Sequence, residues 1–218
     1  MPVGRAGETE DIDHNNSKEN MMIVTVGNAK GGVAKTTSVM YLATAWARRT
    51  GRRALVLDAD PQSSASLWRD MAEDAGHGFE LVDVLPANLS TMQRLRGRCA
   101  SDDLVLVDAP PQGKLLEAAV NVADFVIVPT SDSPLDLQQA WATMAAIPQS
   151  VPSAVLVVRA EAGTRAFGET MAALDEQRTP RFDAIVRKRQ DIKKGMGTVP
   201  AKSWEYAQVL DELMGVAR

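Results

Sequence analysis

The chain has 218 residues, of which 45% are hydrophobic and 24% charged, and these proportions exclude collagen-like, mucin-like and wholly disordered proteins. This length fits one domain with a single substantial core. The one cysteine, Cys99, cannot form an internal disulfide or supply the thiolates of a zinc site or an iron–sulfur cluster. Composition therefore favours a single-domain protein of a reducing, cytoplasmic compartment.

The first 20 residues are polar and acidic, and we expect them to form a disordered tail that precedes a folded domain at residues 21–218. They lack the apolar run of a signal peptide. No later stretch reaches the roughly 18 uncharged apolar residues that a transmembrane helix needs. We therefore expect neither secretion nor a membrane-spanning segment.

Short apolar runs alternate with amphipathic segments through most of the chain. The first run, at residues 22–27, is continuous and β-branched, as in a strand buried on both faces of a parallel sheet. Similar runs predict strands at residues 54–57, 79–84, 104–107, 125–128 and 154–158. Helical spacing predicts helices at residues 36–49, 63–75, 88–98, 113–122 and 135–147. The alternation predicts a single α/β domain with a doubly wound, mostly parallel sheet.

The pattern is weaker after residue 160. There the sequence predicts a helix at 165–177, an edge strand at 182–186 and a terminal helix at 200–216. Doubly wound sheets bind ligands beyond the carboxyl ends of their strands. The motifs described next all fall at such ends.

A glycine-rich segment from Gly27 to Thr37 joins the first predicted strand to the first predicted helix. Glycines let backbone N–H groups converge on an anion, and the helix N-terminus adds partial positive charge. Lys35 would bridge the β- and γ-phosphates of a nucleotide, and the Thr36 hydroxyl would ligate Mg²⁺. The segment therefore predicts a phosphate-binding loop, with Thr37 close to the α-phosphate.

This loop departs from the common phosphate-loop pattern GxxxxGK[ST], because Ala29 and Ala34 take its two glycine positions. The pattern KGGxGK[ST][ST] fits from Lys30 to Thr37, with Ala34 as its one departure. A left-handed backbone at Ala34 would cost roughly 1 kcal/mol. Lys30 supplies a second cation near the phosphates, and spacing alone leaves open whether it acts within its own subunit.

Acidic residues end two of the predicted strands. Asp58 and Asp60 lie on the same face, because side chains alternate along a strand. A carboxylate at this place can orient an attacking water or hold the water shell of a metal. Asp108 ends a run of four aliphatic residues, as in a Walker B strand that binds Mg²⁺. The expected metal site comprises Thr36, Asp58 and Asp108.

Together these motifs resemble the ParA/MinD class of P-loop ATPases with a deviant Walker A loop. The resemblance rests on the KGG and KTT triplets of the loop, on the DADPQ sequence from Asp58 and on the DAPP sequence from Asp108. Segments around residues 125–136 and 189–190 are similar to the short, ParF-like branch of the class. The resemblance covers nearly the whole chain from Met22.

The resemblance implies roles for individual residues. In this class the leading lysine reaches across a sandwich dimer to the partner's ATP, and the second aspartate of the DADPQ sequence positions the attacking water. The expected catalytic residues are therefore Lys30, Lys35 and Asp60, with ATP and Mg²⁺ as cofactors. The expected nucleotide contacts comprise the loop and three residues of a late segment near the adenine: Ala29, Lys30, Gly31, Gly32, Val33, Ala34, Lys35, Thr36, Thr37, Met196, Val199 and Pro200.

Positive charge gathers late in the chain although the net charge is −4. Between Arg178 and Lys194 seven basic residues accompany two acidic ones. Without the resemblance, a solvated helix face is the favoured explanation of such a stretch. With it, we expect contacts to DNA without sequence preference, since counterion release is a local effect. The expected contacts are Arg187, Lys188, Arg189, Lys193 and Lys194.

The resemblance thus implies a cytoplasmic, nucleoid-associated ATPase that segregates plasmid or chromosome DNA, or another cargo. It would form a homodimer with ATP, bind non-specific DNA, and release it when a ParB-like centromere-binding or cargo adaptor protein stimulates hydrolysis. A MinD-like membrane-cycling ATPase is one alternative, but the acidic residues within 203–214 argue against a membrane-binding helix. A nucleotide-dependent binding module with little turnover is the other alternative, if Ala34 impairs hydrolysis.

Overall fold

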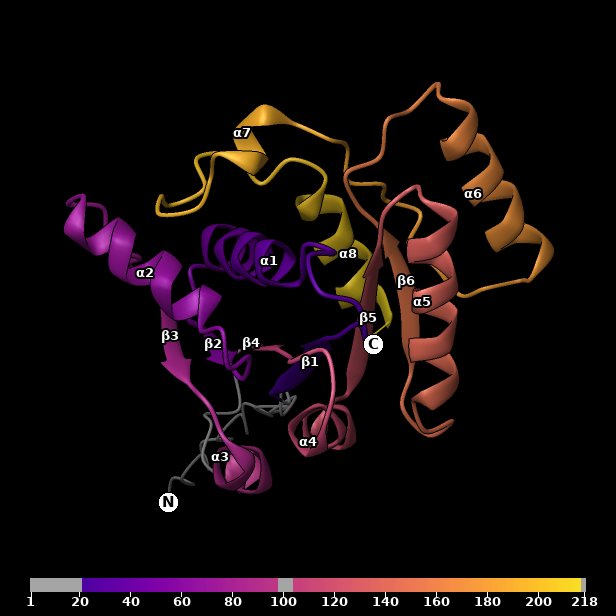
Figure 1. The fold of residues 1–218 in the computed structure, drawn as a ribbon. Coiled ribbons are helices and arrows are strands. Elements are labelled where there is room, and N and C mark those ends of the chain that lie inside the picture. The colour runs from indigo at the N-terminus through magenta and orange to yellow at the C-terminus, as the bar shows by residue number, and fades with distance from the viewer. Residues whose placement is uncertain (1–20, 98–103, 217–218) are drawn as a thin grey trace, which may run out of the picture.

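The computed structural model describes residues 21–97 and 104–216, whose arrangement is shown in Figure 1. The predicted tail at residues 1–20, the last residue of the predicted helix 88–98 and Cys99 lie outside the described residues.

One parallel sheet forms the centre of the domain. Within the described residues its six strands follow the order β3-β2-β4-β1-β5-β6. They are β1 (Met22–Val26), β2 (Ala54–Asp58), β3 (Val82–Pro86), β4 (Leu104–Asp108), β5 (Phe125–Thr130) and β6 (Ser153–Val157). Every residue of β4 and β5 is buried, as the continuous apolar runs require of strands covered on both faces. The prediction of a doubly wound, mostly parallel sheet is confirmed.

Helices cover both faces of the sheet (Figure 1). One face carries α1 (Lys35–Thr50), α2 (Ser64–Asp74) and α8 (Tyr206–Val216), which share a buried cluster with alternate residues of the strands. The other face carries α3 (Leu89–Arg94), the 3-10 turn Leu95–Gly97, α4 (Lys114–Val122) and α5 (Pro134–Ala146). Helix α6 (Arg165–Glu176) packs beside α5, and α7 (Gln190–Lys193) is a single short turn.

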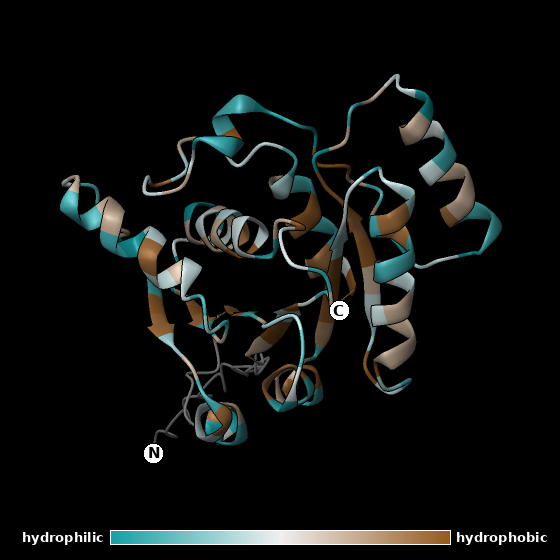
Figure 2. Cartoon of the chain, viewed as in Figure 1, coloured by the Kyte–Doolittle hydropathy of each residue, from teal (hydrophilic) through white to brown (hydrophobic). Residues whose placement is uncertain are grey.

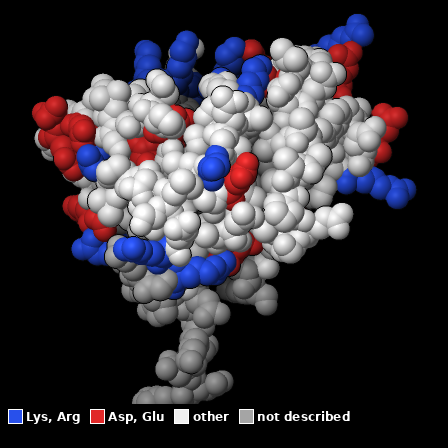
Figure 3. Space-filling model, turned by 60° about the horizontal axis from the view of Figure 1, so that its bottom comes forward, with Lys and Arg blue, Asp and Glu red and all other residues white. Residues whose placement is uncertain are grey.

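The hydropathy of the residues follows this layering. Figure 2 shows hydrophobic strands between helices that are hydrophilic on part of their surface. In Figure 3, charged side chains of both signs lie mainly around the margin of the face turned forward, and broad areas between them are uncharged. None of the helices at residues 21–97 and 104–216 is long and apolar enough to cross a bilayer.

The predicted edge strand at 182–186 is wrong. This segment runs parallel to β6, but only isolated bridges join them, from Val155 to Arg181 and from Ala160 to Arg187. The ladder is interrupted because the N–H groups of Asp183 and Ala184 donate instead to the Glu212 carboxylate, at 2.8 and 2.7 Å. A side chain of α8 therefore takes the place of a strand partner.

Two predicted boundaries also differ. The predicted terminal helix begins at residue 200, whereas α8 begins at Tyr206, because Trp204 adopts a left-handed backbone with φ 48° that a helix does not allow. Strand β3 spans Val82–Pro86 rather than 79–84, so the apolar residues Phe79 and Leu81 precede the strand and pack against the edge of the core.

Candidate nucleotide-binding site

The glycine-rich loop joins the end of β1 to the start of α1, as predicted. Gly32 has φ +73° and Ala34, the residue before α1, has φ 63° and ψ 31°, so both adopt the left-handed conformation. A Cβ atom added to Gly31 or Gly32 would meet nothing within 4 Å, so both face open space. The loop is thus an open cradle in front of a helix N-terminus, which is where proteins bind phosphate groups.

The first half of the loop is tied to β5 and α5. The buried Asn28 side chain donates to the Pro129 carbonyl oxygen at 2.8 Å and accepts from the N–H of Lys30 at 2.8 Å. The N–H of Ala29 donates to the Thr143 hydroxyl of α5 at 3.0 Å. These bonds fix the backbone position from which Lys30 projects.

Lys35 is the first residue of α1, and only 6% of it is exposed. Its Nζ donates to the carbonyl oxygen of Lys30 at 3.1 Å, so the side chain folds back inside the loop. Burial lowers the pKa of Lys35, while the nearby carboxylates of Asp108 and Asp60 act in the opposite direction. A partly desolvated ammonium at this place would gain from an anionic ligand, because charge interactions strengthen away from water.

Asp58 and Asp108 are brought together by the sheet, because they are direct partners in the register of β2 with β4. Asp108 is fully buried, and its Oδ2 accepts from the Thr36 hydroxyl at 2.6 Å. Burial raises the pKa of Asp108 to about 7, with the Thr36 hydrogen bond lowering it and the charge of Asp58 raising it further. Thr36, Asp58 and Asp108 therefore converge as the sequence predicted.

One oxygen of each acid has no partner among the described residues. Oδ1 of Asp58 and Oδ1 of Asp108 are both buried without a hydrogen bond. Orphaned carboxylate oxygens beside a threonine hydroxyl suit Mg²⁺, a hard cation that takes oxygen ligands and is commonly held by one or two carboxylates plus phosphates and water. Residues 21–97 and 104–216 contain no cluster of three or more His, Cys, Asp or Glu side chains that could hold a metal unaided. The residues fit a magnesium ion that arrives with a nucleotide.

Asp60 lies just past β2, at the mouth of the site. Its Oδ1 accepts from the N–H of Gln62 at 2.9 Å in an Asx turn, and the side chain is partly exposed. It lines the same pocket as Lys35 and Thr36. A carboxylate at this place can hold a water molecule near the cradle.

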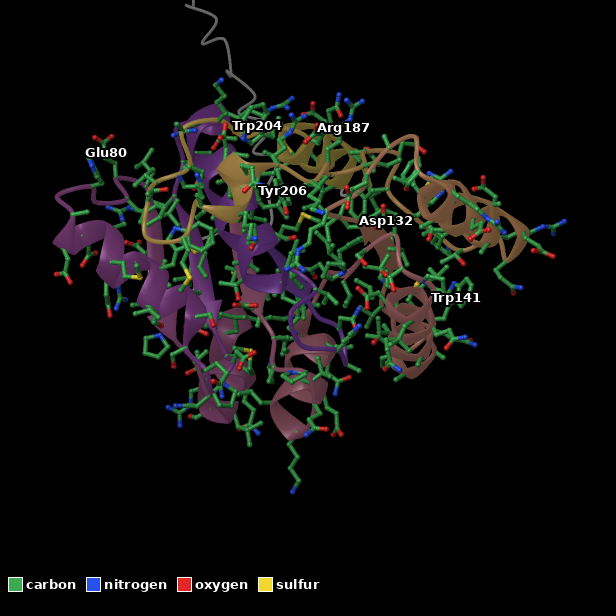
Figure 4. All side chains as sticks on the ribbon, turned by 45° about the horizontal axis from the view of Figure 1, so that its top comes forward. Glu80, Asp132, Trp141, Arg187, Trp204 and Tyr206 are labelled. Carbon is green, nitrogen blue, oxygen red and sulfur yellow. The ribbon has the colours of Figure 1, made fainter. Side chains whose placement is uncertain are left out.

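A pocket of about 990 Å³ opens in front of the loop. Figure 4 shows the side chains around it from above, with Arg187 and Tyr206 labelled. The predicted nucleotide and catalytic residues in its wall are Gly31, Gly32, Ala34, Lys35, Thr36, Thr37, Asp60 and Met196. Other predicted residues do not line it: Ala29, Lys30, Val33, Asp58, Asp108, Val199 and Pro200.

The basic segment at residues 187–194 forms the wall of the pocket opposite the loop. Arg187, Lys188, Arg189 and Lys193 all line it, together with Tyr206 from α8. The sequence predicted these residues for DNA alone and gave no sign that they lie near the phosphate loop. The phosphate loop and the basic segment therefore line one cavity.

Two of the predicted DNA contacts are engaged within the chain. Arg189 forms an ion pair with Glu205 and lies over the Trp204 ring, with its Cζ 4.2 Å from the ring centroid. Lys188 forms an ion pair with Glu161 at 2.6 Å. Burial alone would raise the pKa of Glu205, but hydrogen bonds from Arg189 outweigh it and the pKa is lowered. Among the described residues, no ion pair engages Arg187, Lys193 or Lys194.

Sequence reasoning missed several residues of the site. Arg159 follows β6 with φ 55° and lines the pocket, and its unusual backbone left no sign in the sequence. The Tyr206 hydroxyl lies 3.1 Å from the Ser38 hydroxyl of α1, which places α8 behind the phosphate loop. Trp68 of α2 also lines the pocket.

A family model described as the CobQ/CobB/MinD/ParA nucleotide binding domain matches residues 24–198. The chain belongs to this family. It is 38% identical over 173 residues to the maintenance of carboxysome distribution protein A of Gloeobacter kilaueensis, covering 76% of each chain. It is also 32% identical over 133 residues to the chromosome-partitioning ATPase Soj of Thermus thermophilus, covering 49% of this chain and about half (53%) of that relative.

Solved structures agree with the family assignment at the level of the fold. A structure of apo McdA covers 90% of this chain and 100% of its own, with a TM-score of 0.73 and 16% identity. A structure of cobyrinic acid a,c-diamide synthase from Mycobacterium smegmatis, with a bound ATP analogue and magnesium, covers 89% and 94%, with a TM-score of 0.64 and 21% identity. The sequence prediction of the ParA/MinD class is confirmed.

Proposed function

We propose that the chain is a Mg-ATP-dependent partition or positioning ATPase, whose nucleotide state controls dimerisation and non-specific DNA binding. The observation that supports this best is the single cavity that holds the phosphate loop on one side and the basic segment on the other. One relative is named for the maintenance of carboxysome distribution and another as a chromosome-partitioning ATPase, and these names support a partition or positioning role. ATP and Mg²⁺ are the cofactors that the cradle and the paired acids fit.

The residues around the pocket would have separate roles in binding ATP, holding Mg²⁺ and hydrolysing ATP. The open cradle and Lys35 would bind the β- and γ-phosphates, and Thr36, with Asp58 and Asp108 behind it, would hold Mg²⁺. The metal would neutralise charge on the terminal phosphates. Asp60 would orient the attacking water from the mouth of the pocket. Lys30, which projects from a backbone fixed to β5 and α5, would reach the phosphates of a second subunit.

Dimerisation would double the positive charge available to DNA. Two copies of the basic segment on one composite surface would neutralise more phosphates and release more counterions, so affinity would fall steeply with salt and vary little with sequence. Arg187, Lys193 and Lys194 are the best-placed contacts, because Lys188 and Arg189 first have to leave their partners Glu161 and Glu205. A ParB-like or other cargo-bound protein would stimulate hydrolysis and complete the cycle.

The two alternative functions, a membrane-cycling ATPase and a binding module with little turnover, depend on different parts of the chain. Helix α8 does not present an apolar face to a membrane, because its residues Val209, Leu210 and Leu213 are buried against α1 and the core. A binding module with little turnover depends on Ala34, whose left-handed backbone is accommodated in the loop. An ATPase assay with and without DNA distinguishes an enzyme from that module.

The deciding experiment measures DNA affinity with ATP, with ADP and without nucleotide. We expect tight binding with ATP alone, and equal binding in all three states would refute the proposal. The double variant Lys193→Glu/Lys194→Glu should lose DNA binding even at saturating ATP. The single variant Lys194→Glu, at a residue that does not line the pocket, should weaken DNA binding and keep ATP binding. The matched control is Arg48→Glu/Arg165→Glu, which reverses two exposed charges on α1 and α6, away from the basic segment, and should keep both activities.

A further inference from the structure

The first turn of α2 is fastened to the acidic end of β2. Oδ2 of Asp58 accepts from both the N–H and the hydroxyl of Ser66, at 2.8 and 2.7 Å. The N–H of Ser63 donates to the carbonyl oxygen of Asp60 at 2.8 Å, and Ser63 itself is held at φ 50°. The start of α2 is therefore bonded both to Asp58, of the expected metal site, and to Asp60, which lines the pocket.

The next turn of α2 contacts the segment that follows the basic residues. Trp68, two residues beyond Ser66, is only 3% exposed, and its Nε1 donates to the carbonyl oxygen of Thr198 at 2.7 Å. Its ring packs edge-on against Tyr41, with 6.3 Å between the centroids. One turn later Met71 lies against Gly197, so closely that an added Cβ would stand 3.0 Å from the Met71 Cβ.

The contacted segment is a compact turn joined directly to α7. The N–H of Gly195 donates to the carbonyl oxygen of Ile192 at 3.1 Å. Both the N–H and the hydroxyl of Thr198 donate to the carbonyl oxygen of Gly195, at 3.0 and 2.7 Å. Because these hydrogen bonds hold residues 192–198 in one turn, a displacement of Thr198 would also move Lys194, the end of the basic segment.

The other end of the basic segment is fixed elsewhere. Arg189 is paired with Glu205 and covers Trp204, just before α8. The segment is thus held at one end by α8, which packs on α1, and at the other by α2, which is bonded to Asp58. Within residues 21–97 and 104–216, only the α2 end is linked through hydrogen bonds to an acid expected to respond to Mg²⁺ and the terminal phosphate.

We propose that Trp68 is a positioning residue that transmits the nucleotide state from Asp58 and Asp60, through α2 and its bond to Thr198, to Lys193 and Lys194. This inference rests on the proposed function. When a ligand rearranges the acidic strand end, the first turn of α2 follows, and Trp68 carries the shift to the basic segment. The bond is made to a backbone carbonyl 130 residues away in sequence, so it links two parts of the chain that otherwise meet mainly through packing.

A purely structural role for Trp68 makes a different prediction. If the indole only filled the core beside Tyr41, its loss would weaken the fold and lower ligand binding in every nucleotide state alike. Positioning instead predicts that ATP binding and dimerisation survive while the gain in DNA affinity produced by ATP is lost. An allosteric coupling of the usual size corresponds to a factor of about 5 to 150.

Trp68→Phe tests the inference, because phenylalanine keeps an aromatic ring beside Tyr41 and removes the N–H donor. The matched control is Trp46→Phe, which removes an indole N–H that donates to the carbonyl oxygen of Arg53, in the loop between α1 and β2, at 3.0 Å. For each variant we measure the affinity for ATP, the self-association in the presence of ATP, and the affinity for a fluorescent DNA duplex with and without ATP. In Trp68→Phe we expect the ratio of DNA affinity with saturating ATP to DNA affinity without nucleotide to fall at least about fivefold. Because Trp68 lines the pocket, the ATP affinity of the variant is measured first and ATP is kept saturating, so that weaker ATP binding does not account for the loss.

Each result decides between the inference and its rivals. A full ATP-dependent gain in Trp68→Phe, equal to that of Trp46→Phe, overturns the inference and leaves the proposed function standing. Loss of ATP binding or of dimerisation together with DNA binding also overturns it, in favour of a structural role. If ATP does not raise the DNA affinity of the unchanged protein, the proposed function is refuted, and this inference with it.

A second measurement needs no variant. Hydrogen exchange of the peptide that contains residues 195–198 is compared in the unchanged protein with and without a non-hydrolysable ATP analogue and Mg²⁺. We expect the protection of these amides to change together with that of the first turn of α2. Protection that changes around α2 but stays constant at 195–198 would show that the bond transmits nothing.

Discussion

Lys30 forms an ion pair with Asp136, the third residue of α5 in its own chain. The Ser131 hydroxyl donates to the other carboxylate oxygen of Asp136 at 2.7 Å. Burial alone would raise the pKa of Asp136, but the hydrogen bonds from Lys30 and Ser131 outweigh it and the pKa is lowered. A lysine that is to reach a second subunit therefore has to leave an ionised partner first.

Asp136→Asn should favour the ATP dimer, because it removes the charge that holds Lys30 in its own subunit. An ion pair of this partly exposed kind is worth roughly 1 kcal/mol or less, and one breaks in each subunit, so we expect half-maximal dimerisation at up to about thirtyfold lower protein concentration. Sedimentation at several protein concentrations with ATP measures this. Glu161→Gln, which breaks the exposed pair with Lys188, is the control and should leave dimerisation unchanged. Dimerisation weakened by Asp136→Asn would indicate that Asp136 orients Lys30 for its task.

Ala34→Gly should stabilise the protein. Ala34 has φ 63°, a left-handed conformation that costs an alanine about 1–2 kcal/mol and a glycine almost nothing. The greater freedom of glycine in the unfolded chain offsets roughly 0.4–1 kcal/mol of this gain. Urea denaturation should show a net rise of about 0.5–1 kcal/mol in the free energy of unfolding. Ser63→Gly, at φ 50° before α2, provides a comparison outside the phosphate loop; a fall in both variants would contradict the strain argument.

Gly197→Ala should cost more stability than Gly163→Ala. Both glycines have positive φ, +77° and +91°, so an alanine at either place pays about 1 kcal/mol of backbone strain. An added Cβ at Gly163 meets open space, whereas at Gly197 it meets the Cβ and Cε of Met71 at 3.0 Å. We expect Gly197→Ala to lose roughly 1 kcal/mol more in chemical denaturation. Equal losses would mean that Met71 yields without cost and that α2 is loosely held at this point.

Glu205→Gln should destabilise the protein at neutral pH and not in acid. The pKa of Glu205 is lowered below its ordinary value of 4.5, so its charge stabilises the folded state above that pH. This contribution is lost as the pH falls through the lowered folded-state pKa, because the glutamate of the unchanged protein then becomes neutral too. The difference in unfolding free energy between the two proteins should therefore shrink as the pH falls below about 4.5. Glu161→Gln, in an exposed pair, should show little difference at any pH.

Most of the architecture could be predicted from local patterns. The continuous apolar run of β4 between Leu104 and Val107 occurs only where both faces of a strand are covered, and it is fully buried in the fold. The pattern failed at residues 182–186, where Phe182 and Val186 are buried and bonded to β6 but the N–H groups of Asp183 and Ala184 donate to Glu212. The spacing of apolar side chains predicts which residues are buried. It does not predict which group accepts a hydrogen bond from their backbone N–H groups, and so it could not reveal that Glu212 replaces a strand partner.

The phosphate loop and the acids Asp58 and Asp108 were determined by the sequence itself, because each motif lies at a strand end and parallel strands present their carboxyl ends at one edge. The tertiary structure alone decided what lies across the pocket. It brought the basic residues 187–193 opposite the loop, paired Lys30 with Asp136 and joined Trp68 to Thr198. These contacts join residues about 100 or more positions apart, and they depend on how α2, α5 and α8 pack on the sheet, which no local spacing encodes.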